Sequence, residues 1–342
     1  MARKVKQFSI KDLAKEAGVS ISSVSRVLNN HSDVSEELRK KIQAIIDQSH
    51  FTPDRSQERP IKINVVIGVG DITDYISSIL TGIYWEAEKL NVEISIQRCC
   101  TERISLLRLC RTWRSDAVIL ISAEHLHSQL DELCEADIPC MLIDSKTDNK
   151  SVGYIFMETV FGINQLLRHL ETNGHSDLAM LAADPFDMEI HQTRYKIFCE
   201  YMRSINKEPI LIPLYPLKHI EGIGRAKAAG YQQTLQLLQS HPEVTAIICL
   251  NDEIAMGCYK ACFDSGKRIP EDISIVGFGD ESFSKYMLPG LTTSKSPLTQ
   301  SGRLAVEYLR EYISGKIARL PQIELPSELI IRESVTSIKR KE

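Results

Sequence analysis

The stretch SIKDLAKEAGVSISSVSRVLN, residues 9–29, decides how the start of this chain folds. Leu13, Ala14 and Ala17 recur at the spacing of one helical face, and Gly18 suits the position just after a helix end. A second short helical pattern begins directly after this glycine. Two short helices joined by a glycine turn are typical of a helix-turn-helix, whose second helix can enter the major groove of DNA.

Hydroxyl side chains stand where the next two helices are expected to begin. Ser20 suits the N-cap of the second helix, and Ser35 suits that of a third. Apolar residues follow at helical spacing, Val24, Val27 and Leu28 in the second helix and Leu38, Ile42, Ile45 and Ile46 in the third. Three such helices can share one small core. Spacing alone leaves open a helical hairpin with no role in DNA binding, because helix pairs joined by glycine are common.

Charge separates this end of the chain from the rest. Residues 1–30 hold six basic residues against two acidic ones, a net charge of +4, whereas the whole chain carries −4. A basic end on an acidic protein indicates a polyanionic partner for that end alone. We therefore expect double-stranded DNA as a partner of the head.

The remaining chain is long enough for two further lobes. Of its 342 residues, about 60 form the head and about 280 remain. A hydrophobic content of 43% and a charged content of 25% are those of a globular protein. The first residues, MARKVKQF, lack the apolar region of a secretion signal, and no apolar run reaches about 18 residues. We expect a cytoplasmic protein with no membrane partner.

Motifs for metals, cofactors and catalysis are sparse. Nine cysteines without regular spacing indicate reduced thiols, and no ligand cluster accompanies the pair His125 and His127. Gly68 and Gly70 follow a strand pattern, but Thr73 stands where a dinucleotide-binding turn has its third glycine. The sequence shows no phosphate loop, nucleophile elbow or carboxylate-rich metal motif. We expect no metal, no cofactor and no enzymatic activity.

Beyond the head, strand patterns alternate with helical ones. The apolar strand runs are INVVIGVGD (63–71), VEISIQ, AVILIS, CMLID, LAMLAA, PILIPLY, TAIICL and ISIVGF. This alternation predicts an α/β fold with doubly wound parallel sheets. We divide the chain into a head and hinge, residues 1–60, and a two-lobe domain, residues 61–342. The chain is expected to cross between the lobes near residues 145–165 and 285–297.

These residues carry a resemblance to a known family. IKDLAKEAGVSISSVSRVLNN, VSEELRKKI and FTPD are similar in order and spacing to the DNA-binding head of the LacI/GalR (lactose-repressor) family. The resemblance continues in NGHSDLAML (173–181), ICLNDEIAMG (248–257), IPEDISIVGFGDE (269–281), LPGLTTSKSPL (288–298) and LPSELIIRES (325–334). It implies a small helix-turn-helix head followed by a two-lobe, periplasmic-binding-protein-like effector domain. The implied function is transcriptional regulation, most simply repression. The rival, a transporter's solute-binding protein, lacks a head and has a secretion signal.

The resemblance implies which side chains contact DNA. The family reads bases with the first exposed side chains of the second helix and a following arginine, here Ile21, Ser22 and Arg26. An arginine can bind guanine bidentately, and an isoleucine can contact a thymine methyl group. Phosphate contacts that fix register are expected from Ser9, Ser20, Ser25, Asn29 and Ser35. For each serine, a helix cap is the alternative.

Effector-binding side chains are expected after strands, because ligands of doubly wound sheets bind beyond the carboxyl ends of the strands. Tyr75 and Ile76 follow the first strand, where the family often places aromatic pocket walls. Arg194 occupies the family position of an arginine that binds ligand hydroxyls or charges. Asn251 and Asp252 match a pair whose amide and carboxylate can bind adjacent sugar hydroxyls. The alternatives are a surface tyrosine, an ion-paired arginine and a helix cap at Asp252.

Three positions depart from the family pattern. Arg225 stands at the usual aromatic stacking position. Gly279 replaces the first of two acidic residues and leaves Asp280, and Glu158-Thr159 replaces an Asp-Asn pair. A pocket that loses a ring and a carboxylate and gains an arginine is more cationic. These departures favour an anionic effector, such as a phosphorylated or acidic sugar. A nucleobase or another non-sugar ligand is the alternative.

The segment after the head also departs from the family. An ungapped count places Pro60 where the family has the leucine of a DNA-bending hinge helix. Proline disfavours helix at the preceding residue, so we expect a weak or absent hinge helix. The chain ends at SIKRKE without a leucine heptad. We therefore expect a homodimer that binds a roughly palindromic operator.

Overall fold

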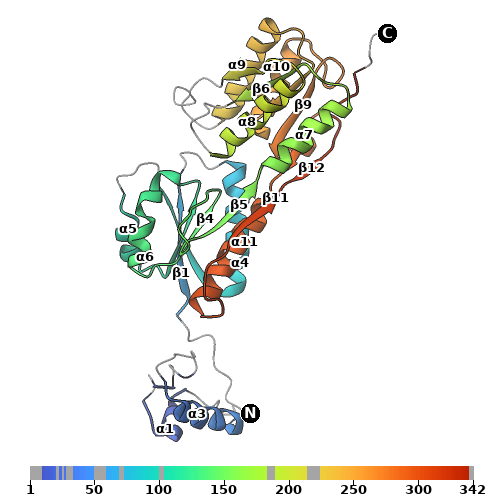
Figure 1. Cartoon of the computed structure of the whole chain (residues 1–342). Coiled ribbons are helices and arrows are strands. Elements are labelled where there is room, and N and C mark those ends of the chain that lie inside the picture. Colours follow the sequence, from blue (N-terminus) through green and yellow to red (C-terminus); the bar gives the residue numbers. More distant parts are fainter. Residues whose placement is uncertain are drawn as a thin grey trace, which may run out of the picture. The chain divides into compact units, whose positions relative to one another are not determined.

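A computed structural model describes residues 10–20, 23–24, 27, 34–49, 59–68, 73–99, 104–182, 189–213 and 224–338. The chain divides into two compact units, Met1–Pro60 and Ile61–Glu342 (Figure 1). Among the described residues, no helix is long and apolar enough to span a bilayer. Arg59 and Pro60 adopt neither helix nor strand, and residues 51–58 of the expected hinge lie outside the described part of the chain.

The first unit contains the expected helical head. Helix α1 spans Ile10–Ala17 and helix α3 spans Glu36–Ser49, and Ser23, Val24 and Val27 between them are helical. Gly18 follows α1 with a φ of +68°, a left-handed conformation that favours glycine. The buried core is shared by all three segments: Leu13, Ala14 and Ala17 from α1, Val24 and Val27 from the middle, and Ile42 from α3. The apolar spacing read from the sequence therefore identifies the face that each helix buries.

Within the described residues of the second unit, six parallel strands form sheet A. Their order across the sheet is β11 (Gln322–Pro326), β5 (Gly153–Glu158), β4 (Cys140–Ile143), β3 (Ala117–Ile121), β1 (Ile61–Ile67) and β2 (Val92–Arg98). One face is covered by α4 (Asp74–Leu90) and α11 (Leu298–Ile313), and the other by α5 (Leu106–Trp113), η2 (Glu124–Gln129) and α6 (Leu130–Glu135). Val65 and Ile67 pack on the first face and Val66 on the second. An unbroken apolar run is therefore required, because both faces of the strand are buried.

Sheet B repeats the arrangement in the other lobe. Its order is β12 (Glu328–Ile330), β10 (Thr292–Lys295), β9 (Ser274–Gly279), β8 (Ala246–Cys249), β6 (Leu178–Ala182) and β7 (Ile210–Pro213), with only the β10–β12 pair antiparallel in this described set. Helices α9 (Arg225–Ser240) and α10 (Asp252–Asp264) cover one face, and α7 (Val160–Thr172) and α8 (Glu189–Ser204) cover the other. The predicted doubly wound α/β fold is confirmed.

Glycines let paired helices approach closely in both lobes. A Cβ on Gly82 of α4 would lie 2.0 Å from the carbonyl oxygen of Thr299, and one on Gly302 of α11 would lie 2.1 Å from that of Ile79. Helices α4 and α11 pack against each other beside sheet A (Figure 1). In the second lobe, Gly257 of α10 meets α9 in the same way. Any side chain at these positions would push the helices apart.

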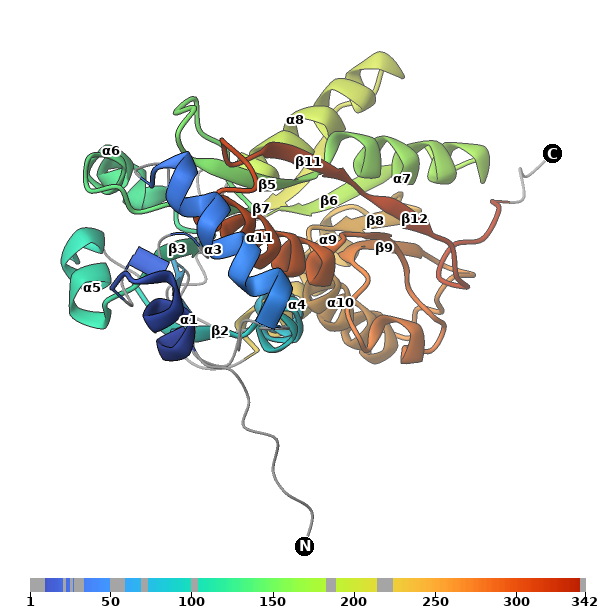
Figure 2. The ribbon, with the colours of Figure 1, turned by 90° about the horizontal axis from the view of Figure 1, so that it is seen from below.

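The chain passes between the two sheets at three places. It leaves sheet A between β5 and α7, returns between β10 and α11, and leaves again at Ser327, which alone separates β11 from β12 (Figures 1 and 2). The third passage was not among the crossings expected from the sequence, because two short strands divided by one residue resemble a single strand. Ser327 Oγ donates a 2.6 Å hydrogen bond to the carbonyl oxygen of Glu158, which ties this passage to the first.

Candidate effector site and DNA-binding head

A buried carboxyl lies at the carboxyl ends of the strands of sheet A. Asp144 directly follows β4, has a φ of +74° and is 2% exposed. Its Oδ2 accepts a 3.2 Å hydrogen bond from Ser122 Oγ after β3, but its Oδ1 finds no hydrogen-bond partner within the described residues. Burial raises the pKa of Asp144 to about 6. Sequence reasoning missed this residue, although an aspartate directly after the apolar run CMLI was the available signal.

Tyr75 of α4 faces Asp144. Its hydroxyl is buried and, in the part of the chain that the structure describes, has no hydrogen bond of normal geometry. Burial, and secondarily the nearby Asp144 carboxyl, raise the pKa of Tyr75 well above its ordinary value. Two polar groups from different elements thus lie together without a full set of partners. Ile76, the other residue expected here, is instead buried in the core of the first lobe.

Arg194 of α8 brings a buried cation to these groups from the second lobe. Its Nε donates to Thr159 Oγ1 at 2.7 Å and its Nη1 donates to the carbonyl oxygen of Leu250 at 2.8 Å. The guanidinium carbon lies 4.0 Å from the centre of the Phe278 ring. Burial lowers the pKa of Arg194 to about 10, and Tyr75 and Asp144 are close enough to oppose this shift. Arg194 therefore stays charged at neutral pH.

Asn251 and Asp252 have separate roles at the end of β8. Asn251 Oδ1 accepts a 2.8 Å hydrogen bond from the Ile254 N–H and caps α10. The helix cap that was the alternative role expected for Asp252 is therefore made by Asn251. Asp252 is fully buried and accepts from Thr293 Oγ1 at 2.7 Å, Ser284 Oγ at 2.5 Å and the Glu281 N–H at 3.0 Å. Its carboxylate holds β10 and the loop after β9 in place. The resemblance, in contrast, predicts that the Asp252 carboxylate binds the effector.

The loop after β9 supplies a second incompletely paired acid. Glu281 Oε2 is buried and lacks a hydrogen-bond partner among the described residues. Burial and the neighbouring Asp252 carboxylate raise the pKa of Glu281 to about 8. The preceding Asp280 forms an ion pair with Arg332 at 2.5 Å. Asp280, which the resemblance assigned to the effector, is thus already paired with the protein.

Two further predicted positions, Glu158 and Arg225, lie at or just before the start of a helix. Both carboxylate oxygens of Glu158 accept from the Phe161 N–H, at 3.1 and 2.9 Å, so Glu158 stabilises the start of α7. Arg225 begins α9 and is partly buried. We call Tyr75, Asp144, Arg194 and Glu281 the polar cluster.

The described residues around the polar cluster include acids that were not singled out from the sequence. The electrostatic neighbours of Tyr75 are Asp144, Glu124 and Arg194, and those of Glu281 are Asp252, Glu253, Asp74 and Lys227. Two of the buried acids, Asp144 and Glu281, had not been identified from sequence. These buried acids favour a neutral ligand, and the anionic effector expected from Arg225 stays a prediction that the described residues do not test.

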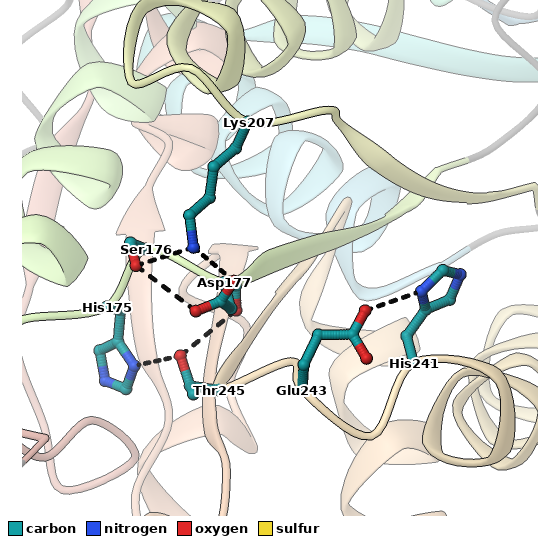
Figure 3. Close-up of polar contacts among 7 residues, drawn as sticks. All are labelled: His175, Ser176, Asp177, Lys207, His241, Glu243 and Thr245. Carbon is teal, nitrogen blue, oxygen red and sulfur yellow. Dashed lines mark hydrogen bonds and ion pairs between the residues drawn. The ribbon is translucent and has the colours of Figure 1, made fainter. Parts of the chain in front are cut away.

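A second polar cluster lies at the opposite end of sheet B (Figure 3). His175 bonds Thr245 Oγ1 at 3.0 Å, and Lys207 forms an ion pair with Asp177 and donates to Ser176 Oγ at 3.1 Å. These residues precede β6, β7 and β8, at the amino ends of the strands. Because ligands of doubly wound sheets bind at the carboxyl ends, this cluster holds strand-connecting turns. It explains the NGHSDLAML motif structurally.

Two predicted DNA-contacting serines are described, and both cap helices. The Ser23 N–H donates to Ser20 Oγ at 3.1 Å, and the Leu38 N–H donates to Ser35 Oγ at 3.4 Å. Both serines are exposed. The other predicted DNA contacts lie outside the described residues: Ser9, Ile21, Ser22, Ser25, Arg26 and Asn29. No group of three or more potential metal-ligating side chains occurs in the described part of the chain.

Comparisons with known proteins agree with this architecture. Residues 9–54 match the family model described as bacterial regulatory proteins, lacI family, and residues 167–335 match a periplasmic binding protein-like domain. The HTH-type transcriptional repressor PurR of Pasteurella multocida (strain Pm70) is 29% identical over 96% of this chain and 99% of its own.

Solved structures match as well. A LacI family transcriptional regulator from Enterococcus faecium with bound ribose has a TM-score of 0.71 and 25% identity, covering 81% of this chain and 100% of its own. The lac repressor dimer bound to operator and the anti-inducer ONPF has a TM-score of 0.65 and 25% identity, covering 97% and 100%. The chain belongs to the LacI family of bacterial regulatory proteins and is a transcriptional regulator of that family.

The raised pKa of Asp144 predicts a pH-dependent stability. Because this pKa is about 6 in the folded chain, above its unfolded value, the contribution of Asp144 to stability is full at acidic pH and is lost as the pH rises through 6. Asp144→Asn removes the penalty of a buried charge. We expect it to raise the melting temperature at pH 8 by roughly 5 °C and to change it little at pH 4.

Calorimetry at the two pH values measures the melting temperatures, with Asp148→Asn, an exposed aspartate in the same loop between β4 and β5, as the matched control. A variant less stable than the parent at pH 8 would show that the ionised carboxylate stabilises the fold.

Proposed function

We propose that this chain is a DNA-binding transcriptional repressor whose operator affinity is controlled by a small neutral sugar bound at the polar cluster. The observation that carries the proposal is the set of three buried polar atoms that lack partners within the described residues: Tyr75 Oη, Asp144 Oδ1 and Glu281 Oε2. Tyr75 and Asp144 belong to the first lobe and Glu281 to the second, and Arg194 is an electrostatic neighbour of Tyr75 and Asp144.

Burial without a hydrogen bond costs about 1–3 kcal/mol for each polar group, so these atoms favour a ligand that pairs with them. Sugar hydroxyls donate and accept hydrogen bonds and suit a phenol, two carboxyls and a guanidinium. At neutral pH the ionised Asp144 carboxylate would repel a phosphate group, whereas Glu281, with a pKa of about 8, is mostly protonated and can donate a hydrogen bond to a sugar oxygen. The Enterococcus faecium relative, solved with bound ribose, supports a sugar as the ligand class.

Contacts between the two lobes can couple effector binding to DNA binding. Ser282 Oγ in the loop after β9 donates a 3.1 Å hydrogen bond to Asp74 Oδ2 at the start of α4. Arg194 of the second lobe lies close enough to Tyr75 and Asp144 of the first for their charges to interact. A ligand that satisfies groups from both lobes stabilises their present arrangement. The free energy by which the ligand favours this arrangement of the lobes can be coupled to DNA affinity.

We infer a homodimer from exposed apolar side chains on two helices and one loop. Trp85 of α4 is 60% exposed, Phe263 of α10 is 79% exposed and Leu288 is 91% exposed. Tyr259 Oη donates to the carbonyl oxygen of Pro289 at 3.0 Å, which fixes the Leu288 loop against α10. Large apolar side chains with this exposure are typical of protein interfaces. A second copy is the proposed partner, as in the lac repressor dimer.

The effector class is tested by titrating neutral pentoses and hexoses, their phosphates and free nucleobases into the full chain. We expect a neutral sugar to bind at least about tenfold more tightly than its phosphate, because the ionised Asp144 carboxylate repels the phosphate group. At 100 times its dissociation constant it stabilises by about 2.7 kcal/mol, which thermal shift detects. Tyr75→Phe and Glu281→Gln should weaken binding, whereas Tyr84→Phe, an exposed tyrosine on the same helix, should not. Preferred binding of a sugar phosphate or a nucleobase would refute the proposed class.

The DNA-reading role is tested at Arg26. Operator sequences are first selected from random duplexes with the full chain. Arg26→Ala is expected to weaken binding to the selected DNA by about 1–3 kcal/mol and to relax specificity at one base pair, because a bidentate guanine contact is lost. Lys41→Ala, an exposed cation on α3, is the control. Unchanged affinity and specificity for Arg26→Ala would exclude Arg26 as a base reader.

A further inference from the structure

A groove lies on the outer side of the second lobe, away from the residues of the polar cluster. It has a volume of about 460 Å³ and is lined by one face of α7, from Phe161 to Thr172, and by Leu329 of β12. Figure 1 shows α7 and β12 side by side at the edge of sheet B. Small-molecule sites in proteins occupy about 300–1,000 Å³. The groove is therefore large enough for a ligand of modest size.

Two polar atoms in the groove lack partners. Gln165 Oε1 and His169 Nε2 are buried without a hydrogen bond to any described residue. The two side chains are four positions apart on α7 and so lie on the same face of the helix. Buried polar atoms in native proteins almost always have a partner, so each exception requires an explanation. Burial also lowers the pKa of His169, which keeps its ring neutral at pH 7.

The other residues that line the groove indicate which class of ligand it would bind. Phe161 is 52% exposed and, with Leu329, offers an apolar surface. Arg168 is exposed and forms no ion pair with any described residue. A cation beside apolar surface favours an anion with a flat apolar body, because arginine binds carboxylates bidentately. The unpaired amide oxygen of Gln165 requires an N–H or O–H donor on that ligand.

We propose that this groove is a second ligand site, for a small planar organic acid that carries an O–H or N–H donor. The acid pairs with Arg168, the donor pairs with Gln165 Oε1, and the ring packs on Phe161 and Leu329. The site shares no residue with the polar cluster. Helix α7 begins where the chain passes between the lobes, and Glu158 caps its first turn through the Phe161 N–H.

The test uses the full chain and three probes that differ by one group. 4-Hydroxybenzoate has the ring, the acid and the donor; benzoate lacks the donor, and 4-hydroxybenzyl alcohol lacks the acid. Binding is measured by isothermal titration and by ligand-observed NMR. We expect 4-hydroxybenzoate to bind with a Kd of about 1 mM or below and the other two probes at least about tenfold more weakly. Absence of binding by 4-hydroxybenzoate, or equal binding of all three probes, would overturn the proposal.

Substitutions in the groove test whether 4-hydroxybenzoate binds there. Arg168→Gln, at an exposed position, and Gln165→Leu, at a partly buried one, each remove one proposed contact and should weaken binding of 4-hydroxybenzoate at least about tenfold. Arg203→Gln removes a comparable exposed arginine from the neighbouring helix α8 and should leave binding unchanged. Binding that survives both groove substitutions at full strength would place the probe elsewhere and contradict the assignment.

Discussion

The buried guanidinium of Arg194 is the constraint on which the centre of the effector domain depends. A buried charge is tolerated only where neighbouring groups compensate it. Here the compensation comes from the Thr159 hydroxyl at the passage between the lobes, the Leu250 carbonyl at the end of β8 and the Phe278 ring on β9. Each partner belongs to a different element. One side chain therefore fixes the elements that position the polar cluster.

The carboxylate of Asp252 has the matching role on the other side of sheet B. Its three hydrogen bonds fix β10 and the loop that carries Glu281, and Glu281 in turn is left with an unpaired oxygen. The fully paired acid is structural, and the incompletely paired acids Asp144 and Glu281 are available to a ligand. Hydrogen-bond satisfaction, not acidity alone, separates the two kinds of carboxyl in this region.

The sequence alone predicted the head and the two sheets because their signals are local. Helical spacing, a glycine at a helix end and unbroken apolar strand runs do not depend on distant contacts. The site was harder to predict. The resemblance predicted Tyr75 and Arg194 as effector-binding residues, whereas Asp144 and Glu281 become candidates only once strand order and burial are known. The resemblance predicted Asp252 and Asp280 as ligand-binding residues. Their protein partners Thr293 and Arg332 lie far along the chain, so no local sequence signal indicates these contacts. The passage at Ser327 was missed because no local signal marks it.

The central claim is that a neutral sugar at the polar cluster controls DNA affinity. The most direct measurement is the affinity of the full chain for its selected operator, with and without the sugar that gives the largest thermal shift. The account predicts a change of about 5- to 150-fold at saturating sugar, the range typical of allosteric coupling. It also predicts that Glu281→Gln reduces this change without altering affinity for DNA alone. An operator affinity that does not respond to the bound sugar would contradict the account.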